Sequence, residues 1–227
     1  MAQYIVFEGT EGVGKTTQVQ KLTDYLREQG YSVLQTKEPG TSHSPLTMQL
    51  RGIMLDNQYD EELTQNAREL VSQAIRSIHL EKVIKPALTK YDFIIQDRGI
   101  LSGLAYGEAC GNAPYWLVAL ADQVSAPLTT RHNGFYSELY TKTIYLDGNV
   151  SKGLDAALSA KKEFEAGDAM ESRGESFLES VKMNMDTYSS NFNTTKIFVD
   201  GRNIEEVFNE ILNSIEGEIG AVRGKSN

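Results

Sequence analysis

A glycine-rich segment near the start of the chain places the tightest constraint on its fold. Residues 9–16 read Gly-Thr-Glu-Gly-Val-Gly-Lys-Thr, which matches the phosphate-loop pattern G-x-x-x-x-G-K-[ST]. An apolar, β-prone run at residues 4–7 precedes it, and Val19, Leu22 and Leu26 follow at the spacing of one helix face. Strand, turn and helix in this order predict a βα unit whose turn binds a phosphate.

The residue types of this loop indicate how it would hold a nucleoside triphosphate. Glycines let backbone N–H groups approach an anion because they carry no Cβ, and the helix N-terminus favours negative charge. Lys15 would reach the outer phosphates, and the Thr16 hydroxyl would ligate Mg²⁺. The predicted donor site consists of Gly9, Thr10, Glu11, Gly12, Val13, Gly14, Lys15, Thr16 and Thr17.

Charge and composition narrow the classes of partner. The formal net charge of −9 over 227 residues, without a long basic run, argues against binding to a nucleic-acid backbone. No apolar run approaches the roughly 18 residues of a membrane span, and the polar Gln3, Glu8 and Glu11 predict that no signal peptide opens the chain. The single cysteine, Cys110, excludes an internal disulfide. We expect a cytoplasmic protein without nucleic-acid or membrane partners.

Strand and helix patterns alternate along the chain. Strands are expected at residues 4–7, 31–36, 93–95, 143–146 and 196–199, and helices at 46–55, 61–88 and 203–215 and from residues 114 and 177 onward. This alternation predicts a three-layer α/β/α fold with a five-stranded parallel sheet. Ligands of such sheets bind beyond the carboxyl ends of the strands, where Gly9, Glu38 and Asp97 fall. We expect one domain over residues 1–220 and a flexible tail over 221–227.

Polar landmarks follow the phosphate loop in a set order. They are Glu38-Pro39-Gly40, Arg51 within Leu-Arg-Gly-Ile-Met-Leu, Arg76, Ile-Lys-Pro-Ala-Leu at 84–88, Asp97-Arg98, Tyr145-Leu146-Asp147 and Val199-Asp200. The series resembles the thymidylate kinase family of P-loop nucleoside monophosphate kinases. The resemblance covers about residues 3–215 and is poor at 111–140. It implies ATP-dependent phosphorylation of dTMP to dTDP, with Mg²⁺, by a homodimer.

The resemblance also implies roles for individual residues. Lys15 and Thr16 would serve ATP, and Asp97 would hold Mg²⁺ directly or through water. Arg51, Arg76 and Arg98 would gather the acceptor phosphate, Glu11 would hold the sugar 3′-hydroxyl, and Glu38 would help order the acceptor site. A mobile acceptor-binding segment is expected near residues 38–75. A lid is expected at 151–175, with Lys161, Lys162 and Arg173 as candidate catalytic cations.

The base subsite departs from the family pattern. Ser72 stands where an aromatic residue usually stacks on thymine, and Gly103 and Gly107 replace a hydroxyl and an amide that bond the base. Residues 72, 103 and 106 would still face the acceptor base. Either the stretch 111–140 supplies replacements, or the base is bulkier or modified. Tyr106, Trp116, Phe135 and Tyr136 are the aromatic candidates for stacking on it.

Two other classes compete with a kinase. A nucleotide-binding module without activity is one, because the base subsite departs from the pattern. A GTP-dependent switch is the other, since residues 89–92 read Thr-Lys-Tyr-Asp and fit a guanine-reading motif. That motif precedes an expected strand, whereas a guanine-reading loop should follow one.

Overall fold

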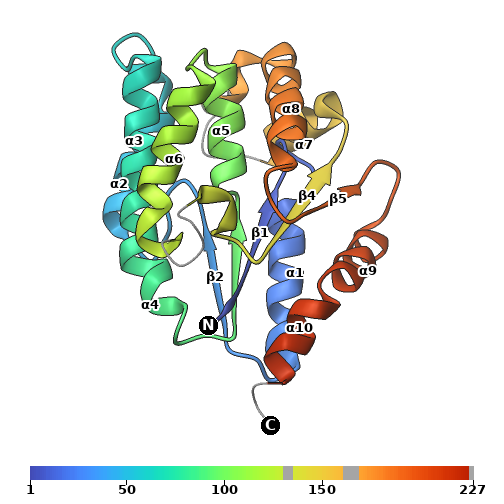
Figure 1. The fold of residues 1–227 in the computed structure, drawn as a ribbon. Coiled ribbons are helices and arrows are strands. Elements are labelled where there is room, and N and C mark those ends of the chain that lie inside the picture. Colours follow the sequence, from blue (N-terminus) through green and yellow to red (C-terminus); the bar gives the residue numbers. More distant parts are fainter. Residues whose placement is uncertain (130–134, 161–168, 225–227) are drawn as a thin grey trace.

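Five parallel strands form the centre of the molecule (Figure 1). The computed structural model describes residues 1–129, 135–160 and 169–224. The strands are β1 (Gln3–Glu8), β2 (Val33–Lys37), β3 (Phe93–Asp97), β4 (Lys142–Asp147) and β5 (Thr194–Phe198). They lie in the order β2-β3-β1-β4-β5, and every neighbouring pair is parallel. The predicted fold class and all five predicted strands are therefore confirmed.

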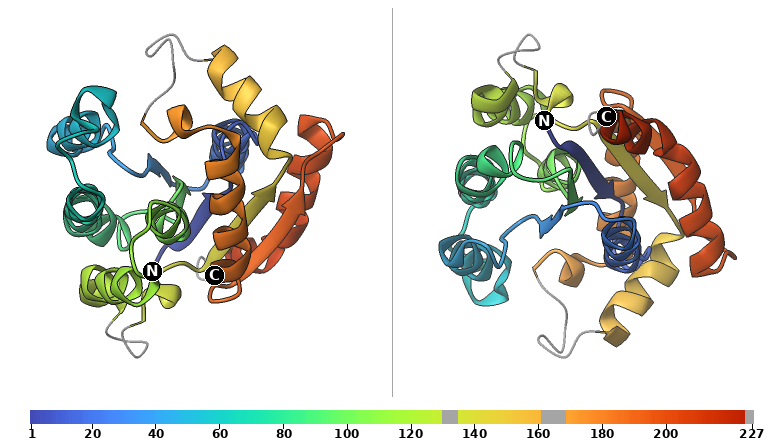
Figure 2. Two further views of the ribbon diagram at one scale, coloured as in Figure 1. Left: turned by 90° about the horizontal axis from the view of Figure 1, so that it is seen from above. Right: turned by 90° about the horizontal axis from the view of Figure 1, so that it is seen from below.

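Helices connect the strands and cover both faces of the sheet (Figure 2). They are α1 (Lys15–Glu28), α2 (Pro45–Leu55), α3 (Gln65–His79), α4 (Lys85–Ala87), α5 (Ile100–Ala109), α6 (Pro114–Thr129), α7 (Val150–Ala160), α8 (Glu175–Ser189), α9 (Ile204–Ser214) and α10 (Glu216–Arg223). Single 3₁₀ turns stand at Asn57–Tyr59, Tyr136–Glu138 and Glu171–Arg173. Among the described helices, none combines the length and hydropathy that a membrane crossing requires.

The two faces of the sheet carry separate apolar cores, as the alternation of β1 shows. Tyr4 and Val6 pack with residues of α5, α6 and α8, whereas Ile5 and Phe7 pack with residues of α1, α9 and α10. Successive side chains of a strand point to opposite faces, so a continuous apolar strand is buried on both. The rigid sheet that results holds the carboxyl ends of β1, β2 and β3 at one edge, where the site forms.

Three elements differ from the sequence-based expectation. The helix predicted over 61–88 begins at Gln65, capped by Thr64, and passes through a π-helical turn, Leu80–Ile84, before α4. Helix α5 was not predicted, because Gly103 and Gly107 interrupt its apolar pattern. The described domain also extends past residue 220, since α10 continues to Arg223 and buries Val222.

Candidate active site

The phosphate loop joins β1 to α1 at the carboxyl end of the central strand. Gly12 has a φ of 68° and Gly14 a φ of 88°, which only glycine adopts without strain. A Cβ on Gly12 would also collide with the backbone of Gly153 in α7. The loop conformation and its contact with α7 both therefore depend on glycine.

Lys15 lies inside this loop as the first residue of α1. Its side chain is buried, and its Nζ donates a hydrogen bond to the Thr10 carbonyl oxygen. The pKa of Lys15 is lowered to about 8. Burial is the largest cause, and repulsion from Arg98 is the second. The loop thus holds a desolvated cation, which a triphosphate would stabilise.

ATP affinity should fall at alkaline pH because of this lowered pKa. Phosphate oxygens bind the protonated lysine, so affinity is nearly constant below the free-protein pKa of about 8. Above that value binding requires proton uptake, and Kd should rise up to about ten-fold per pH unit. Calorimetric titration of ATP between about pH 7 and pH 10 measures this. A constant Kd over that range would contradict the expectation.

Thr16 and Asp97 meet beside Lys15. The Thr16 hydroxyl donates to Asp97 Oδ2 at 2.6 Å, which joins the start of α1 to the end of β3. The described residues contain no cluster of three or more His, Cys, Asp or Glu side chains that would hold a metal by itself. One hydroxyl and one carboxylate suit Mg²⁺, which keeps several waters and shares its shell with substrate phosphates.

Arg98 follows Asp97 and turns toward the phosphate loop. Its φ of 61° is unusual for a residue other than glycine. Its guanidinium donates to the Gly9 carbonyl oxygen at 2.8 Å and to Glu11 Oε1 at 2.7 Å. The Tyr106 hydroxyl donates to the other Glu11 oxygen. These contacts compensate the backbone strain and fix the guanidinium beside the loop.

Glu8 supports Arg98 from the end of β1 through the Ser102 hydroxyl. Ser102 donates to Glu8 and lies 3.2 Å from Arg98 Nη1. Burial raises the pKa of Glu8 to about 6, although the hydrogen bond with Ser102 and the charge of Arg98 both oppose that shift.

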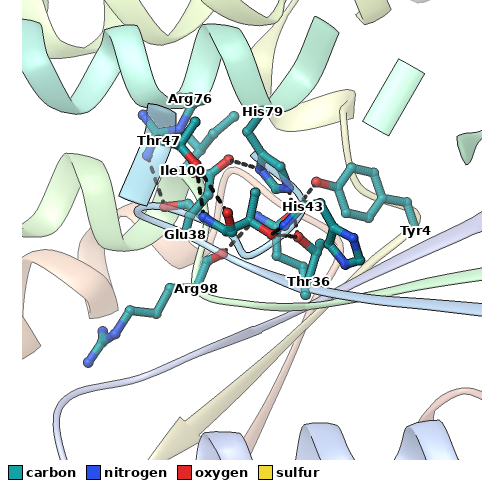
Figure 3. A network of polar contacts seen from close by, with 12 residues as sticks. Tyr4, Thr36, Glu38, His43, Thr47, Arg76, His79, Arg98 and Ile100 are labelled. Carbon is teal, nitrogen blue, oxygen red and sulfur yellow. Dashed lines mark hydrogen bonds and ion pairs between the residues drawn. The ribbon is translucent and has the colours of Figure 1, made fainter. Parts of the chain in front are cut away.

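Glu38 lies at the centre of a buried polar network beyond the end of β2 (Figure 3). Arg76 Nε donates to Glu38 Oε2 at 2.9 Å, and His79 Nδ1 lies 2.9 Å from Oε1. His79 Nε2 is 2.8 Å from the Thr36 hydroxyl, so the network ties α3 to β2. Burial alone would raise the pKa of Glu38, but the charge of Arg76 and the hydrogen bond from His79 hold it below its usual value.

One cavity of about 350 Å³ contains most of the predicted site. The predicted residues that line it are Glu11, Gly12, Lys15, Thr16, Glu38, Arg51, Ser72, Arg76, Asp97, Arg98, Gly103 and Tyr106. Arg51 Nη1 donates to the Pro39 carbonyl oxygen at 2.8 Å. In Figure 3 the Arg98 side chain points away from the network around Glu38. Arg51, Arg76 and Arg98 thus line the cavity from α2, from α3 and from the loop after β3.

The described part of the segment expected as a lid, residues 151–175, contributes apolar residues to the cavity lining rather than the predicted cation. Ala157 and Met170 line the cavity, but Arg173 is not among its lining residues. The Arg173 guanidinium lies 5.3 Å from the centre of the Phe177 ring, and its Nε donates to the Ala169 carbonyl oxygen. Lys161 and Lys162 lie outside the described residues. A catalytic role of Arg173 thus stays a prediction that this arrangement does not support.

The part of the cavity around Gly103 and Gly107, where the base subsite is expected, is more crowded than the two glycines suggest. A Cβ on Gly103 would lie 3.0 Å from Arg76 Nη1, and a Cβ on Gly107 would lie 2.7 Å from Leu117 and 3.0 Å from Glu69 Oε2. Neighbouring side chains therefore fill the space that these glycines leave. Of the aromatic candidates, Tyr106 lines the cavity, while Trp116, Phe135 and Tyr136 do not.

Sequence reasoning missed six polar residues of the cavity lining. They are Lys37, Gln65, Arg68, Glu69, Ser102 and Asn112. Helical spacing could have revealed part of this lining. It places four residues on one face of α3, namely Gln65, Glu69, Ser72 and Arg76. The Arg68 guanidinium donates to the Met54 carbonyl oxygen through Nη1 and to Asp60 Oδ1 through Nη2, the latter at 2.6 Å. These two bonds indicate a structural role for Arg68.

The segment that resembled a guanine-reading motif lies at the opposite end of the strands. Asp92 Oδ2 accepts hydrogen bonds from the backbone and hydroxyl of Ser32, at 2.8 and 2.7 Å. Both residues precede their strands, β3 and β2, whereas the phosphate loop follows β1. A switch protein that reads guanine there is excluded by this geometry.

The fold and this site define a P-loop nucleotide-binding protein of the three-layer α/β/α class. The family model described as Thymidylate kinase matches residues 7–211. The chain therefore belongs to the thymidylate kinase family.

Individual relatives agree with this assignment. The chain is 36% identical to the thymidylate kinase of a Psychrobacter species over 160 residues, which cover 69% of this chain and 71% of the relative. It is 32% identical to that of Acinetobacter baumannii over 184 residues, covering 81% and 84%. A crystal structure of thymidylate kinase from Ehrlichia chaffeensis superposes on this chain with a TM-score of 0.69. The match covers 94% of this chain and 98% of that one at 24% identity, and it supports the fold.

Proposed function

We propose that the chain transfers the γ-phosphoryl group of ATP to dTMP and forms dTDP for dTTP synthesis. Lys15 binds the outer phosphates of ATP, while Thr16 and Asp97 hold Mg²⁺. Arg51, Arg76 and Arg98 gather the acceptor phosphate. The acceptor phosphate is itself the nucleophile, so positioning and charge stabilisation supply the catalysis.

The observation that carries this proposal is the shared cavity. Lys15 from the phosphate loop lines the same space as Arg51 of α2 and Arg76 of α3. Two phosphorylated molecules would repel one another there unless fixed cations surrounded them. Family membership further supports a homodimer and a cytoplasmic location, both of which we include in the proposal.

An acceptor screen tests the proposal directly. ATP consumption is measured with each common nucleoside monophosphate and with 5-substituted pyrimidine deoxynucleotides, with and without Mg²⁺. We expect the highest kcat/KM with dTMP and no turnover without the metal. Preference for a bulkier 5-substituted acceptor would instead favour the same reaction on a modified base.

Arg98→Ala separates an enzyme from a nucleotide-binding module without activity. In an enzyme, loss of this guanidinium should lower kcat by about 100-fold while the Kd for ATP changes by about two-fold or less. Arg202→Ala is the matched control, because Arg202 pairs with Glu210 at the protein surface. If the Arg98 variant turned over as fast as the control, the catalytic assignment of Arg98 would be wrong.

A further inference from the structure

A buried carboxylate lies beside Gly107 at one end of the cavity. No cation of the described residues forms an ion pair with it, although the charge of Arg76 acts on it from a distance. Glu69 of α3 is only 6% exposed, and it lines the cavity. Its Oε1 accepts a hydrogen bond from Gln73 Nε2 at 2.7 Å, the one hydrogen bond that the described residues give this carboxylate. Its Oε2 lies against Gly107 of α5. A carboxylate that is removed from water in this way calls for a further hydrogen-bond donor.

A second buried polar residue, Asn112, lines the same cavity and also contacts Gly107. Asn112, in the loop between α5 and α6, is 5% exposed and lines the same cavity. Its Oδ1 has no hydrogen-bond partner within the described part of the chain, and its side-chain nitrogen forms no hydrogen bond there. The Asn112 backbone N–H donates to the Gly107 carbonyl oxygen at 3.1 Å, so Glu69 and Asn112 both abut Gly107.

Both residues contact Gly107 near the C-terminal end of α5. The Glu69 carboxylate lies against this glycine, and the Asn112 backbone bonds to its carbonyl oxygen. The pair offers an acceptor and an amide that can donate. Thymine presents a ring N–H next to a carbonyl oxygen, which is the complementary pair.

We propose that Glu69 and Asn112 read the base of the acceptor, in place of side chains absent at Gly103 and Gly107. The Glu69 carboxylate accepts the ring N–H of a thymine-type base, and the Asn112 amide donates to an adjacent carbonyl oxygen. This inference rests on the proposed function in one respect, namely that the acceptor nucleotide carries thymine. It makes these two side chains specificity determinants that act without contacting the reacting phosphates.

A methylated acceptor tests the role of Glu69 in the unmodified protein. Calorimetry compares the binding of dTMP with that of dTMP methylated at the ring nitrogen N3, which removes the N–H. We expect binding of the methylated nucleotide to be weaker by at least about 100-fold, because the carboxylate then faces a methyl group. Equal binding of the two nucleotides, or tighter binding of dCMP than of dTMP, would overturn the proposal.

Two variants assign the effect to the named residues. Glu69→Gln should weaken dTMP binding by about ten-fold and reduce the discrimination against the methylated nucleotide, while the KM for ATP is unchanged. Asn112→Ala should weaken dTMP binding by about ten-fold and leave that discrimination intact. Glu61→Gln is the matched control, because Glu61 is an exposed carboxylate just before α3. Discrimination unchanged in Glu69→Gln would also overturn the proposal.

These readouts are independent of turnover. If the protein bound dTMP with the expected selectivity but phosphorylated no monophosphate, the proposed reaction would fail while the base-reading role stood. If it phosphorylated dTMP without discriminating against the methylated form, the reaction would stand and the base-reading role would fail.

Discussion

Replacement of Lys15 by methionine is expected to lower kcat/KM for phosphoryl transfer on the order of 10³-fold. Lys15 is the cation of the phosphate loop, and it lines the cavity together with Thr16 and Asp97. Charge accumulates on the transferred phosphoryl group, and a fixed cation in a desolvated loop stabilises it strongly. Steady-state kinetics with dTMP and saturating ATP measure the loss.

The fold of the Lys15→Met variant should persist or become more stable. Burial lowers the pKa of Lys15 to about 8, which means that the folded protein penalises its charge. An apolar side chain of similar length removes that penalty. Lys21→Met is the matched control on the same helix, since Lys21 pairs with Glu205 at the surface. Kinetics that matched those of the control would show that Lys15 does not serve the reaction.

Arg76→Met should lower the free energy of unfolding by about 3–5 kcal/mol, because it leaves a buried carboxylate without its main counter-charge. The side chains of Arg76 and Glu38 are 4% and 3% exposed, and their atoms Nε and Oε2 are 2.9 Å apart. His79 remains as the second partner of Glu38. Urea denaturation of the two proteins at neutral pH measures the difference.

The stabilising effect of the Glu38–Arg76 pair should depend on pH in one direction. The folded protein holds the pKa of Glu38 below its usual value. The contribution is therefore present above the unfolded-state pKa and is lost as pH falls through the lower, folded-state pKa. The difference between the original protein and Arg76→Met should shrink at acidic pH.

Two further variants control the Arg76 experiment. Arg27→Met removes an arginine that is half exposed and lies 4.0 Å from Asp24, and it should change stability by no more than about 0.5 kcal/mol. Combining Arg76→Met with Glu38→Gln should restore part of the lost stability, because the uncompensated charge is gone. Equal midpoints for Arg76→Met and Arg27→Met would show that the buried pair contributes nothing.

The phosphate loop, the proposed donor half of the site, could be predicted because it is encoded locally. Lys15 and Thr16 belong to one continuous strand, turn and helix, and the pattern of residue types determines their geometry. Asp97 could be added because parallel strands place their carboxyl ends at the same edge of the sheet. Arg51 and Arg76 came from the resemblance to the family, and the structure places both in the same cavity as Lys15.

The base end could not be predicted in the same way, because it depends on packing between α3, α5 and a loop. The glycines at 103 and 107 suggested an enlarged pocket, but side chains from α3 and α6 fill the space beside them. Arg173 contacts Phe177, only four residues further along the chain, but that it does not line the cavity is visible only in the structure. Neither arrangement leaves a periodic signal in the sequence.

The sequence alone therefore determined the parallel α/β sheet, the phosphate loop and the family, because hydrophobic periodicity and short-range motifs depend on residues close together in the chain. Only the tertiary structure decided that Glu69 and the Asn112 backbone both contact Gly107 and that Glu38 is buried between Arg76 and His79. Such contacts join residues far apart in the chain. Their geometry follows from how whole helices pack on the sheet, which no local pattern records.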